Sequence, residues 1–82
     1  MFSVYAIKSN ISGRIYIGQS NEVKRRIADH NKGIVRSTKK DVPWVLIAVQ
    51  EVKTRNEARW IEKCLKNSHR KRARWLEKNE IL

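Results

Sequence analysis

Alternating apolar and polar positions predict two strands at the start of the chain. Along residues 2 to 8 every second side chain falls on the same face of an extended segment, and Tyr5 lies in the middle of it. Residues 9 to 13 supply turn chemistry, and residues 14 to 18 then alternate again around Tyr16. The two segments therefore predict a β-hairpin with one tyrosine on each strand.

A continuous apolar run predicts a third strand. From Trp44 to Val49 no charged residue interrupts the sequence, which is the pattern of a strand covered on both faces. We therefore place this strand in the centre of the sheet and expect helices to cover it. The predicted fold class is α/β, of the α+β type, with a three-stranded antiparallel sheet of residues 2 to 8, 14 to 18 and 44 to 51 flanked by about three helices.

The first predicted helix begins and ends at residues that favour helix termini. Either Ser20 or Asn21 can accept the free N–H groups of its first turn. The helical pattern ends near Asn31 and Gly33, because these residue types are common at helix C-termini.

Two polar side chains of this helix lie at or beside its apolar stripe. Val23, Ile27 and His30 are spaced i, i+4 and i+7, so the histidine falls on the stripe that should face the core. Arg26 borders the same stripe. These are unusual places for two polar groups, and both residues are candidates for a functional site.

A capping box predicts the start of the second helix. Thr54 and Glu57 form a Thr-x-x-Glu pattern, in which the threonine accepts a backbone N–H and the glutamate reaches back, so Glu57 has a structural task. Glu62 lies three residues before Leu65, on the stripe that should be buried. A buried carboxylate is costly unless it is paired or binds a metal. Glu62 is therefore either an ion-pair partner of a residue such as Arg26 or a metal ligand.

The end of the chain predicts a basic helix over about residues 68 to 78. Ala73 and Leu76 are expected to face inward, and the cations largely outward: Arg70, Lys71, Arg72 and Arg74. Arg70 and Arg74 are candidates for contact with phosphate. The three tryptophans are expected to serve mostly as packing residues: Trp44, Trp60 and Trp75.

The segment from residue 34 to residue 42 is polar and basic and predicts an exposed loop before Pro43. Its cations can follow a phosphate backbone, and the candidates for nucleic-acid binding are Arg36, Lys39 and Lys40. The alternative interpretation is a solvated loop without a role.

The charge of the chain favours a polyanionic partner. The 82 residues contain 19 Lys and Arg against 8 Asp and Glu, which gives a formal net charge of +11 spread along the whole sequence. Such self-repulsion is offset when a polyanion binds, so nucleic acid is the leading inference. The length allows one domain, residues 1 to 82, without a separate module for specificity.

Membrane association and export do not fit the pattern. The sequence contains no apolar stretch of bilayer-spanning length, and its first residues lack a basic head followed by an apolar run. A basic amphipathic helix at a membrane surface would need an apolar face, and the apolar residues belong to the core. Cys64 is the single cysteine, which fits a reducing compartment. We therefore expect a cytoplasmic protein with no membrane partner.

Five polar side chains thus point toward the core or across strands, and each alone has an ordinary structural explanation: Tyr5, Tyr16, Arg26, His30 and Glu62. Their order along the chain adds information. Four short motifs follow one another with compatible spacing: Ser3-Val4-Tyr5, Tyr16-Ile17-Gly18, the stretch from Arg26 through His30 and Asn31 to Gly33, and Glu57-Ala58 followed by Glu62 and Lys66.

In these motifs the chain resembles the GIY-YIG nuclease family over nearly its whole length. It is similar to small stand-alone members related to the N-terminal nuclease domain of UvrC. The resemblance implies the GIY-YIG nuclease fold and cleavage of DNA phosphodiester bonds with one divalent ion.

The resemblance also implies roles for the five polar residues. Glu62 would hold one Mg²⁺ or Mn²⁺ ion, with waters and the scissile phosphate completing an oxygen shell. Arg26 would bind a non-bridging phosphate oxygen. Tyr5 or Tyr16 would act as general base or hydrogen-bond the nucleophile, which requires a nearby cation because a free phenol has a pKa near 10. His30 would contribute to that field or relay the proton from the tyrosine.

The sequence departs from the family pattern at three places. Ser3-Val4 replaces the Gly-Ile of the first motif, a change that preserves a strand. The late asparagine that helps many members bind phosphate does not align clearly with Asn67 or Asn79, so a basic residue such as Arg74 would have to replace it. Gln19 stands where some repair nucleases have lysine, which removes a helper of the general base.

The sequence therefore predicts a metal-dependent DNA endonuclease with low intrinsic sequence specificity, in DNA repair, recombination or mobile-element processing, with a protein partner as one source of specificity. The alternative is a catalytically weak or inactive nucleic-acid-binding module of the same fold. A third interpretation, a structural protein of the ribosome or nucleoid, accounts for the charge but leaves an inward-facing Glu62 and His30 unexplained.

Overall fold

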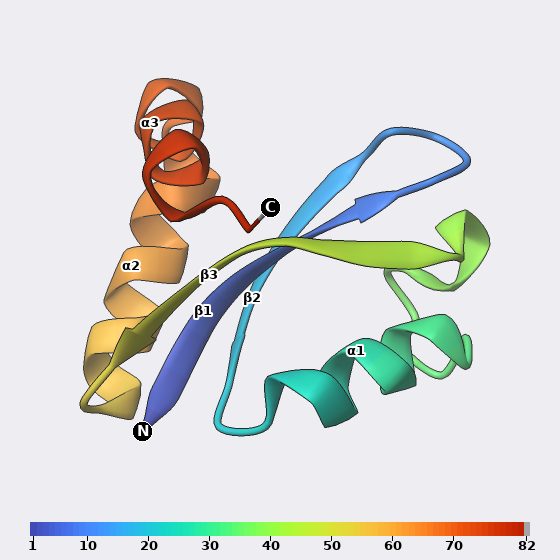
Figure 1. Ribbon diagram of the computed structural model, residues 1–82, viewed down its shortest axis with the longest axis horizontal. Coiled ribbons are helices and arrows are strands. Elements are labelled where there is room, and N and C mark those ends of the chain that lie inside the picture. The colour runs from blue at the N-terminus through green and yellow to red at the C-terminus, as the bar shows by residue number, and fades with distance from the viewer. Residues whose placement is uncertain (82) are drawn as a thin grey trace.

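Three strands form one antiparallel sheet in the computed structural model, which describes residues 1–81. The sheet has the order β2-β1-β3, and within the described residues three α-helices and one short 3-10 helix accompany it. The elements in chain order are β1 (Phe2–Ser9), β2 (Ile15–Ser20), α1 (Val23–Asn31), η1 (Lys39–Asp41), β3 (Trp44–Val52), α2 (Arg55–Asn67) and α3 (His69–Asn79) (Figure 1). The predicted fold class, strand number and antiparallel pairing are confirmed.

The predicted hairpin forms and brings the two tyrosines to neighbouring strands. Ser9 Oγ accepts the N–H of Ser12 at 3.0 Å, and Gly13 adopts a φ of 76°, which glycine reaches without steric cost. The resulting register places Tyr5 directly opposite Gly18. This pairing matters for the site because glycine leaves the neighbourhood of the Tyr5 ring free.

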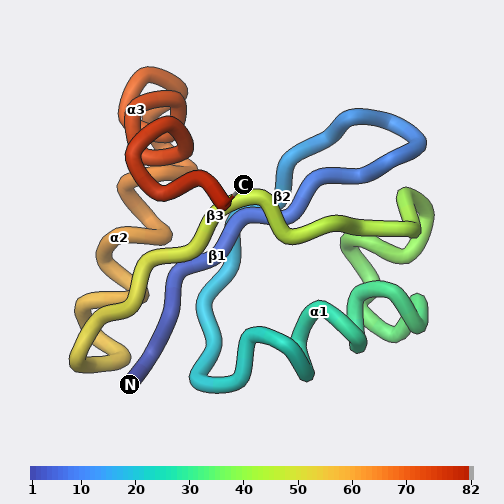
Figure 2. The backbone as a smooth tube through the Cα atoms, viewed as in Figure 1, coloured from blue at the N-terminus to red at the C-terminus, as the bar shows by residue number. Residues whose placement is uncertain are grey.

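The third strand was predicted correctly in extent but wrongly in position. β3 lies at the edge of the sheet, and β1 lies in the centre, paired on both sides. The free edge of β3 is covered by the end of the chain, where the Ile81 N–H donates to the Ile47 carbonyl at 2.9 Å (Figure 2). The apolar run of β3 therefore reflects helices on both faces and a covered edge, rather than a central place.

Two hydrophobic clusters lie on opposite faces of the sheet. One packs beneath α2 and α3 and includes Val4, Ala6, Ala58, Leu65 and Trp75. The other packs beneath α1 and includes Tyr5, Ile7 and Trp44, with Val23 and Ile27 against them. Figure 1 shows α1 on the side of the sheet away from α2 and α3. The alternation read from the sequence thus assigns Tyr5 to the α1 side.

The predicted helix caps are only partly correct. Neither Ser20 nor Asn21 caps α1, because the helix begins later and Glu22 takes the cap position. Ser20 Oγ instead accepts the Glu22 N–H at 2.9 Å and forms a turn before the helix. Thr54 caps α2 as predicted, accepting the N–H of Glu57 at 3.1 Å, whereas no return hydrogen bond from the Glu57 carboxylate occurs within residues 1–81.

α3 presents a different face to the sheet from the one predicted. Trp75 is buried and its indole N–H donates to Gln50 Oε1 on β3 at 2.7 Å. This contact sets the rotation of the helix, so Leu76 is half-buried as predicted but Ala73 is exposed.

Among residues 1–81, none of the helices combines the length and the apolar character that a membrane span requires.

Candidate active site

A chain of hydrogen bonds links β1, α1 and the following loop beneath the α1 face. The Tyr5 hydroxyl lies 3.0 Å from His30 Nε2, and His30 Nδ1 lies 2.8 Å from Thr38 Oγ1. Thr38 Oγ1 in turn donates to the Val35 carbonyl at 3.3 Å. His30 and Thr38 are completely buried and Tyr5 almost so. His30 is therefore on the core-facing stripe as predicted, with both ring nitrogens satisfied.

One arrangement of protons satisfies all of these hydrogen bonds. In it Thr38 donates its one hydroxyl proton to the Val35 carbonyl and accepts from His30 Nδ1–H. His30 Nε2 then accepts the hydroxyl proton of Tyr5, so the imidazole is neutral in this arrangement.

Burial and neighbouring charges hold Tyr5 and His30 in their neutral forms. The pKa of Tyr5 is raised to about 12, first by burial and then by the nearby Tyr16 and Glu62, while Arg26 acts in the opposite direction. The pKa of His30 is lowered from 6.5, first by burial and then by the Arg26 charge, with Asp29 acting in the opposite direction. Tyr5 is accordingly a phenol, not a phenolate, at neutral pH.

Gly18 makes room for the Tyr5 ring. A Cβ at this position would come within 2.6 Å of the Tyr5 hydroxyl oxygen and 3.1 Å of a Tyr16 ring carbon. Atoms in proteins do not approach so closely, and Tyr5 cannot retreat because it is buried in the cluster beneath α1. The glycine of the Tyr16-Ile17-Gly18 motif is thus a steric requirement of the tyrosine pair.

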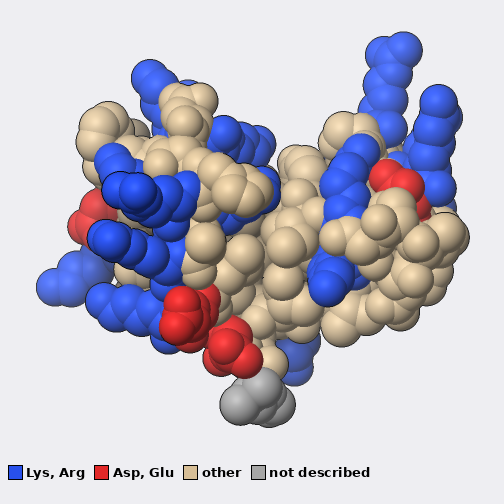
Figure 3. Space-filling view, turned by 90° about the horizontal axis from the view of Figure 1, so that it is seen from above, with Lys and Arg blue, Asp and Glu red and all other residues tan. Residues whose placement is uncertain are grey.

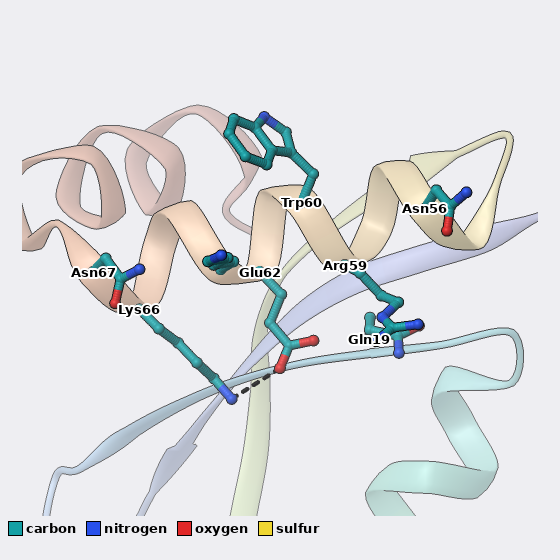
Figure 4. Close-up of a pocket in the computed structure, with 8 residues that line it drawn as sticks. Gln19, Asn56, Arg59, Trp60, Glu62, Lys66 and Asn67 are labelled. Carbon is teal, nitrogen blue, oxygen red and sulfur yellow. Dashed lines mark ion pairs between the residues drawn. The ribbon is translucent and has the colours of Figure 1, made fainter.

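Tyr16 and Glu62 meet at the β2 side of the site through Lys66. The Tyr16 ring centroid lies 5.1 Å from that of His30, and Lys66 Nζ lies 5.3 Å from the Tyr16 centroid. Glu62 Oε2 accepts from Lys66 Nζ at 2.8 Å, and both side chains reach from α2 toward β2 (Figure 4). The ion-pair partner of Glu62 is thus Lys66, one helical turn away, rather than Arg26.

Arg26 completes the group around Tyr5. Its side chain is 41% exposed, and its one ion-pair contact among residues 1–81 is a distant one, 3.8 Å to Asp29. A guanidinium that is both accessible and weakly paired is free to bind an incoming anion. Arg26 lies on α1 one helical turn before His30, which is hydrogen-bonded to Tyr5, and Arg26 acts to lower the pKa of Tyr5.

The structure thus assembles all five predicted site residues, and their catalytic roles stay predictions. Two residues that support the site escaped the sequence analysis. Gly18 was within a quoted motif, so its place opposite Tyr5 in the hairpin could have identified it. Thr38 gave no signal because it lies in a basic segment with no periodic pattern.

Glu62 suits one hard cation rather than a metal cluster. Its side chain is 22% exposed, and one carboxylate oxygen contacts Lys66 while the other is open to the groove beside α2. Among the described residues no group of three or more His, Cys, Asp or Glu side chains is placed to hold a metal. A single carboxylate oxygen fits Mg²⁺ or Mn²⁺ when water and a phosphate supply the remaining ligands.

The predicted phosphate-binding cations are exposed but lie in two separate places. Arg36, Lys39 and Lys40 follow α1, whereas Arg70 and Arg74 lie on α3 across the molecule. Figure 3 shows Lys and Arg gathered on two raised parts of one face, with few acidic groups and a hollow between them.

The loop between α1 and β3 is more ordered than predicted. Part of it forms η1, Thr38 is buried, and Arg14 binds it twice, through the Ser37 carbonyl at 2.6 Å and Asp41 at 3.3 Å. The loop was predicted to be exposed throughout, which is wrong because Thr38 satisfies His30 and so must enter the core.

Comparison with protein families assigns the fold and site to a known class. The model of the GIY-YIG catalytic domain matches residues 1–77 of this chain. The protein therefore belongs to the GIY-YIG family, a nuclease family whose members generally use divalent metal ions. Neither the curated proteins nor the solved structures gave a match.

Proposed function

We propose that the protein is a DNA endonuclease that uses Mg²⁺ or Mn²⁺ and has little sequence preference of its own. The observation that carries this proposal is the grouping of the Tyr5–His30 hydrogen bond and the Tyr16 ring with Lys66, the ion-pair partner of Glu62. Hydrolysis of a phosphodiester needs a base for water and positive charge at the phosphate. The assembled residues offer both.

In the proposed mechanism Tyr5 is the base that accepts the proton of the attacking water. A water that attacks phosphorus gives its proton to the Tyr5 oxygen, while the Tyr5 hydroxyl proton passes to His30 Nε2. The attacking water oxygen forms the new P–O bond, the bond from phosphorus to the leaving oxygen breaks, and that oxygen takes up a proton from solvent water. His30 ends as an imidazolium that donates from Nδ1 to Thr38. No free phenolate forms, so the high pKa of Tyr5 does not oppose the reaction.

Charge at the phosphate comes from two directions. Arg26 donates to a non-bridging oxygen through its planar guanidinium. A divalent ion held by Glu62 would act as a Lewis acid on the same phosphate. Lys66 forms an ion pair with Glu62, and both side chains point toward β2.

Plasmid nicking in Mg²⁺, Mn²⁺ or EDTA tests the proposal. We expect wild-type protein to nick in either metal, and Glu62→Gln and Arg26→Ala to lose at least about 100-fold in rate, a typical cost for removing one electrostatic group. Glu57→Gln is the matched control, because it removes the same charge from an exposed position on the same helix. Nicking that survives in both site variants contradicts the assignment.

The same assay separates the alternative function. Salt-sensitive DNA binding without metal-dependent nicking identifies a binding module that has kept the fold. We further propose a cytoplasmic role in DNA repair, recombination or mobile-element processing, with a protein partner supplying target choice. The charge and the single cysteine support this part.

A further inference from the structure

Trp60 is the exception among the three tryptophans. Trp44 and Trp75 are 2% and 9% exposed, and each indole N–H donates to a protein oxygen. Trp60 on α2 is 66% exposed, and within residues 1–81 its indole makes no hydrogen bond. The prediction that it serves as a packing residue is therefore wrong, and burial in the core does not explain why a tryptophan occupies this position.

Trp60 and Glu62 both line a groove along α2. The groove has a volume of about 670 Å³ and is lined by α2 together with Gln19 of β2. At about 100° per residue, Glu62 and Trp60 stand roughly 160° apart around the helix, with Lys66, Arg59 and Lys63 falling in order between them. Figure 4 shows Trp60 pointing away from β2, and Glu62 and Lys66 pointing toward it.

The side chains that line this groove suit a nucleic-acid strand as the ligand. Three cations lie between the carboxylate and the indole, and the one acidic residue of the groove is paired with Lys66. Proteins that bind single strands combine such a basic track with an aromatic side chain on which a base stacks. The excess of cations in this groove disfavours an apolar protein surface as its ligand, because such a ligand would bury these cations without partners.

We propose that this groove binds the unpaired nucleotides beside the scissile phosphate, with one base stacked on Trp60 and the backbone held by Arg59 and Lys63. This inference rests on the proposed function for the position of the scissile phosphate at Glu62. Stacking requires an unpaired base because bases within a duplex already stack on each other. The groove therefore favours substrates that carry a single-stranded stretch, whatever its sequence.

Binding measurements in EDTA test the groove without cleavage. The probes are a fluorescent single-stranded oligonucleotide and the same strand within a blunt duplex, with Trp60→Ala, Trp60→Phe and Ile11→Ala as variants. Ile11 is an equally exposed apolar residue in the turn between β1 and β2, away from α2. We expect Trp60→Ala to weaken single-strand binding about 10-fold, Trp60→Phe to restore most of it, and Ile11→Ala to leave it unchanged.

The expected selectivity distinguishes stacking from general attraction. Duplex binding should change less than about twofold in Trp60→Ala, because phosphate contacts dominate it. Quenching of Trp fluorescence by the single strand should disappear in Trp60→Ala, since the other two indoles are buried. Unchanged single-strand affinity, or equal losses for single strand and duplex, would overturn the proposal. The first of these results would leave Trp60 as a contact for a protein.

The two proposals fail in different ways. If Trp60 governs single-strand binding but no metal-dependent nicking is found, the groove stands and the endonuclease does not. If Glu62-dependent nicking occurs and Trp60→Ala binds single strands like wild type, the endonuclease stands and the groove does not.

Discussion

The α1 side and the α2 side of the site differ in burial: the first is enclosed in the core, and the second is accessible to solvent. Beneath α1, Tyr5, His30 and Thr38 are buried and joined by hydrogen bonds, and every described polar atom there has a partner. On α2, Glu62 and Lys66 are accessible to solvent and contact mainly each other. The polar groups on the α1 side thus have their partners within the folded protein, whereas those on the α2 side remain available to a ligand.

This difference separates proton transfer from ligand binding. A relay needs fixed distances and a low dielectric, which burial provides. Groups that bind an ion and a polyanion must stay accessible and give up their existing partners easily, which exposure provides. Substitutions on the α1 side should therefore cost stability, and substitutions on the α2 side should cost function alone.

The largest expected loss of stability is that of Gly18→Ala. The added Cβ overlaps the Tyr5 hydroxyl, so the ring or the strand must move, at a cost of about 1 to 3 kcal/mol. Urea unfolding measures this cost, and Gln19→Ala, the next residue of β2, serves as the control with a change of about 0.5 kcal/mol or less. Wild-type stability in Gly18→Ala would show that the tyrosine is not held in place.

Thr38→Val comes next, because it keeps the shape of the side chain and removes its hydroxyl. The buried His30 Nδ1–H then has no acceptor, which costs about 1 to 3 kcal/mol. Thr38→Ser should recover most of the loss. A role beyond packing appears in ¹⁵N NMR, where Thr38→Val should shift the His30 tautomer away from Nδ1–H. Unaltered imidazole signals would contradict the proposed direction of the relay.

The stability of the protein should fall as the pH is lowered from about 8 to about 5. The pKa of His30 is lower in the folded protein than its usual 6.5. At pH values between the folded pKa and 6.5, His30 is therefore protonated in the unfolded chain and neutral in the folded chain. The contribution of neutral His30 to the free energy of unfolding is therefore fully present above the usual pKa. It decreases as the pH falls below that pKa, and it stops changing below the folded pKa. The slope reaches at most about 1.4 kcal/mol per pH unit.

The pH dependence has a natural control in the second histidine. His30→Gln should flatten the slope, and His69→Gln should not, because His69 is exposed at the start of α3. Chemical unfolding at several pH values measures both. An equal slope in wild type and His30→Gln would assign the effect to other groups.

The smallest change in stability is expected for Glu62→Gln. Its ion pair with Lys66 is accessible to water, and such pairs contribute about 0 to 1 kcal/mol. The variant should unfold like wild type while losing nicking activity. A stability loss as large as that of Thr38→Val would show that the α2 side is structural too, and the contrast between the two sides would fail.

Local patterns identified most of the elements and the site residues. Alternation located the hairpin and both tyrosines, helical spacing marked His30 and Glu62, and the Thr54 cap fixed the start of α2. These features depend on neighbours within one or two turns of chain, so the sequence contains the necessary information. The motif order added the family.

Errors arose where distant segments meet. β3 lies at an edge because the end of the chain covers it, and Ala73 is exposed because Trp75 docks on Gln50. Neither contact produces a periodic pattern in the nearby sequence, so neither could be predicted from it. Trp60 resembles the other tryptophans in sequence and differs from them only in the surface that α2 presents to solvent.

The sequence by itself determined the family, the two tyrosine-bearing strands and the inward place of His30, because period and motif are properties of the chain. The tertiary structure alone decided that Thr38 is the hydrogen-bond partner of His30 Nδ1, that Gly18 accommodates Tyr5, and that Glu62 and Trp60 line one groove. These relations join residues far apart in sequence, and only packing brings such residues within the reach of a hydrogen bond or a steric contact.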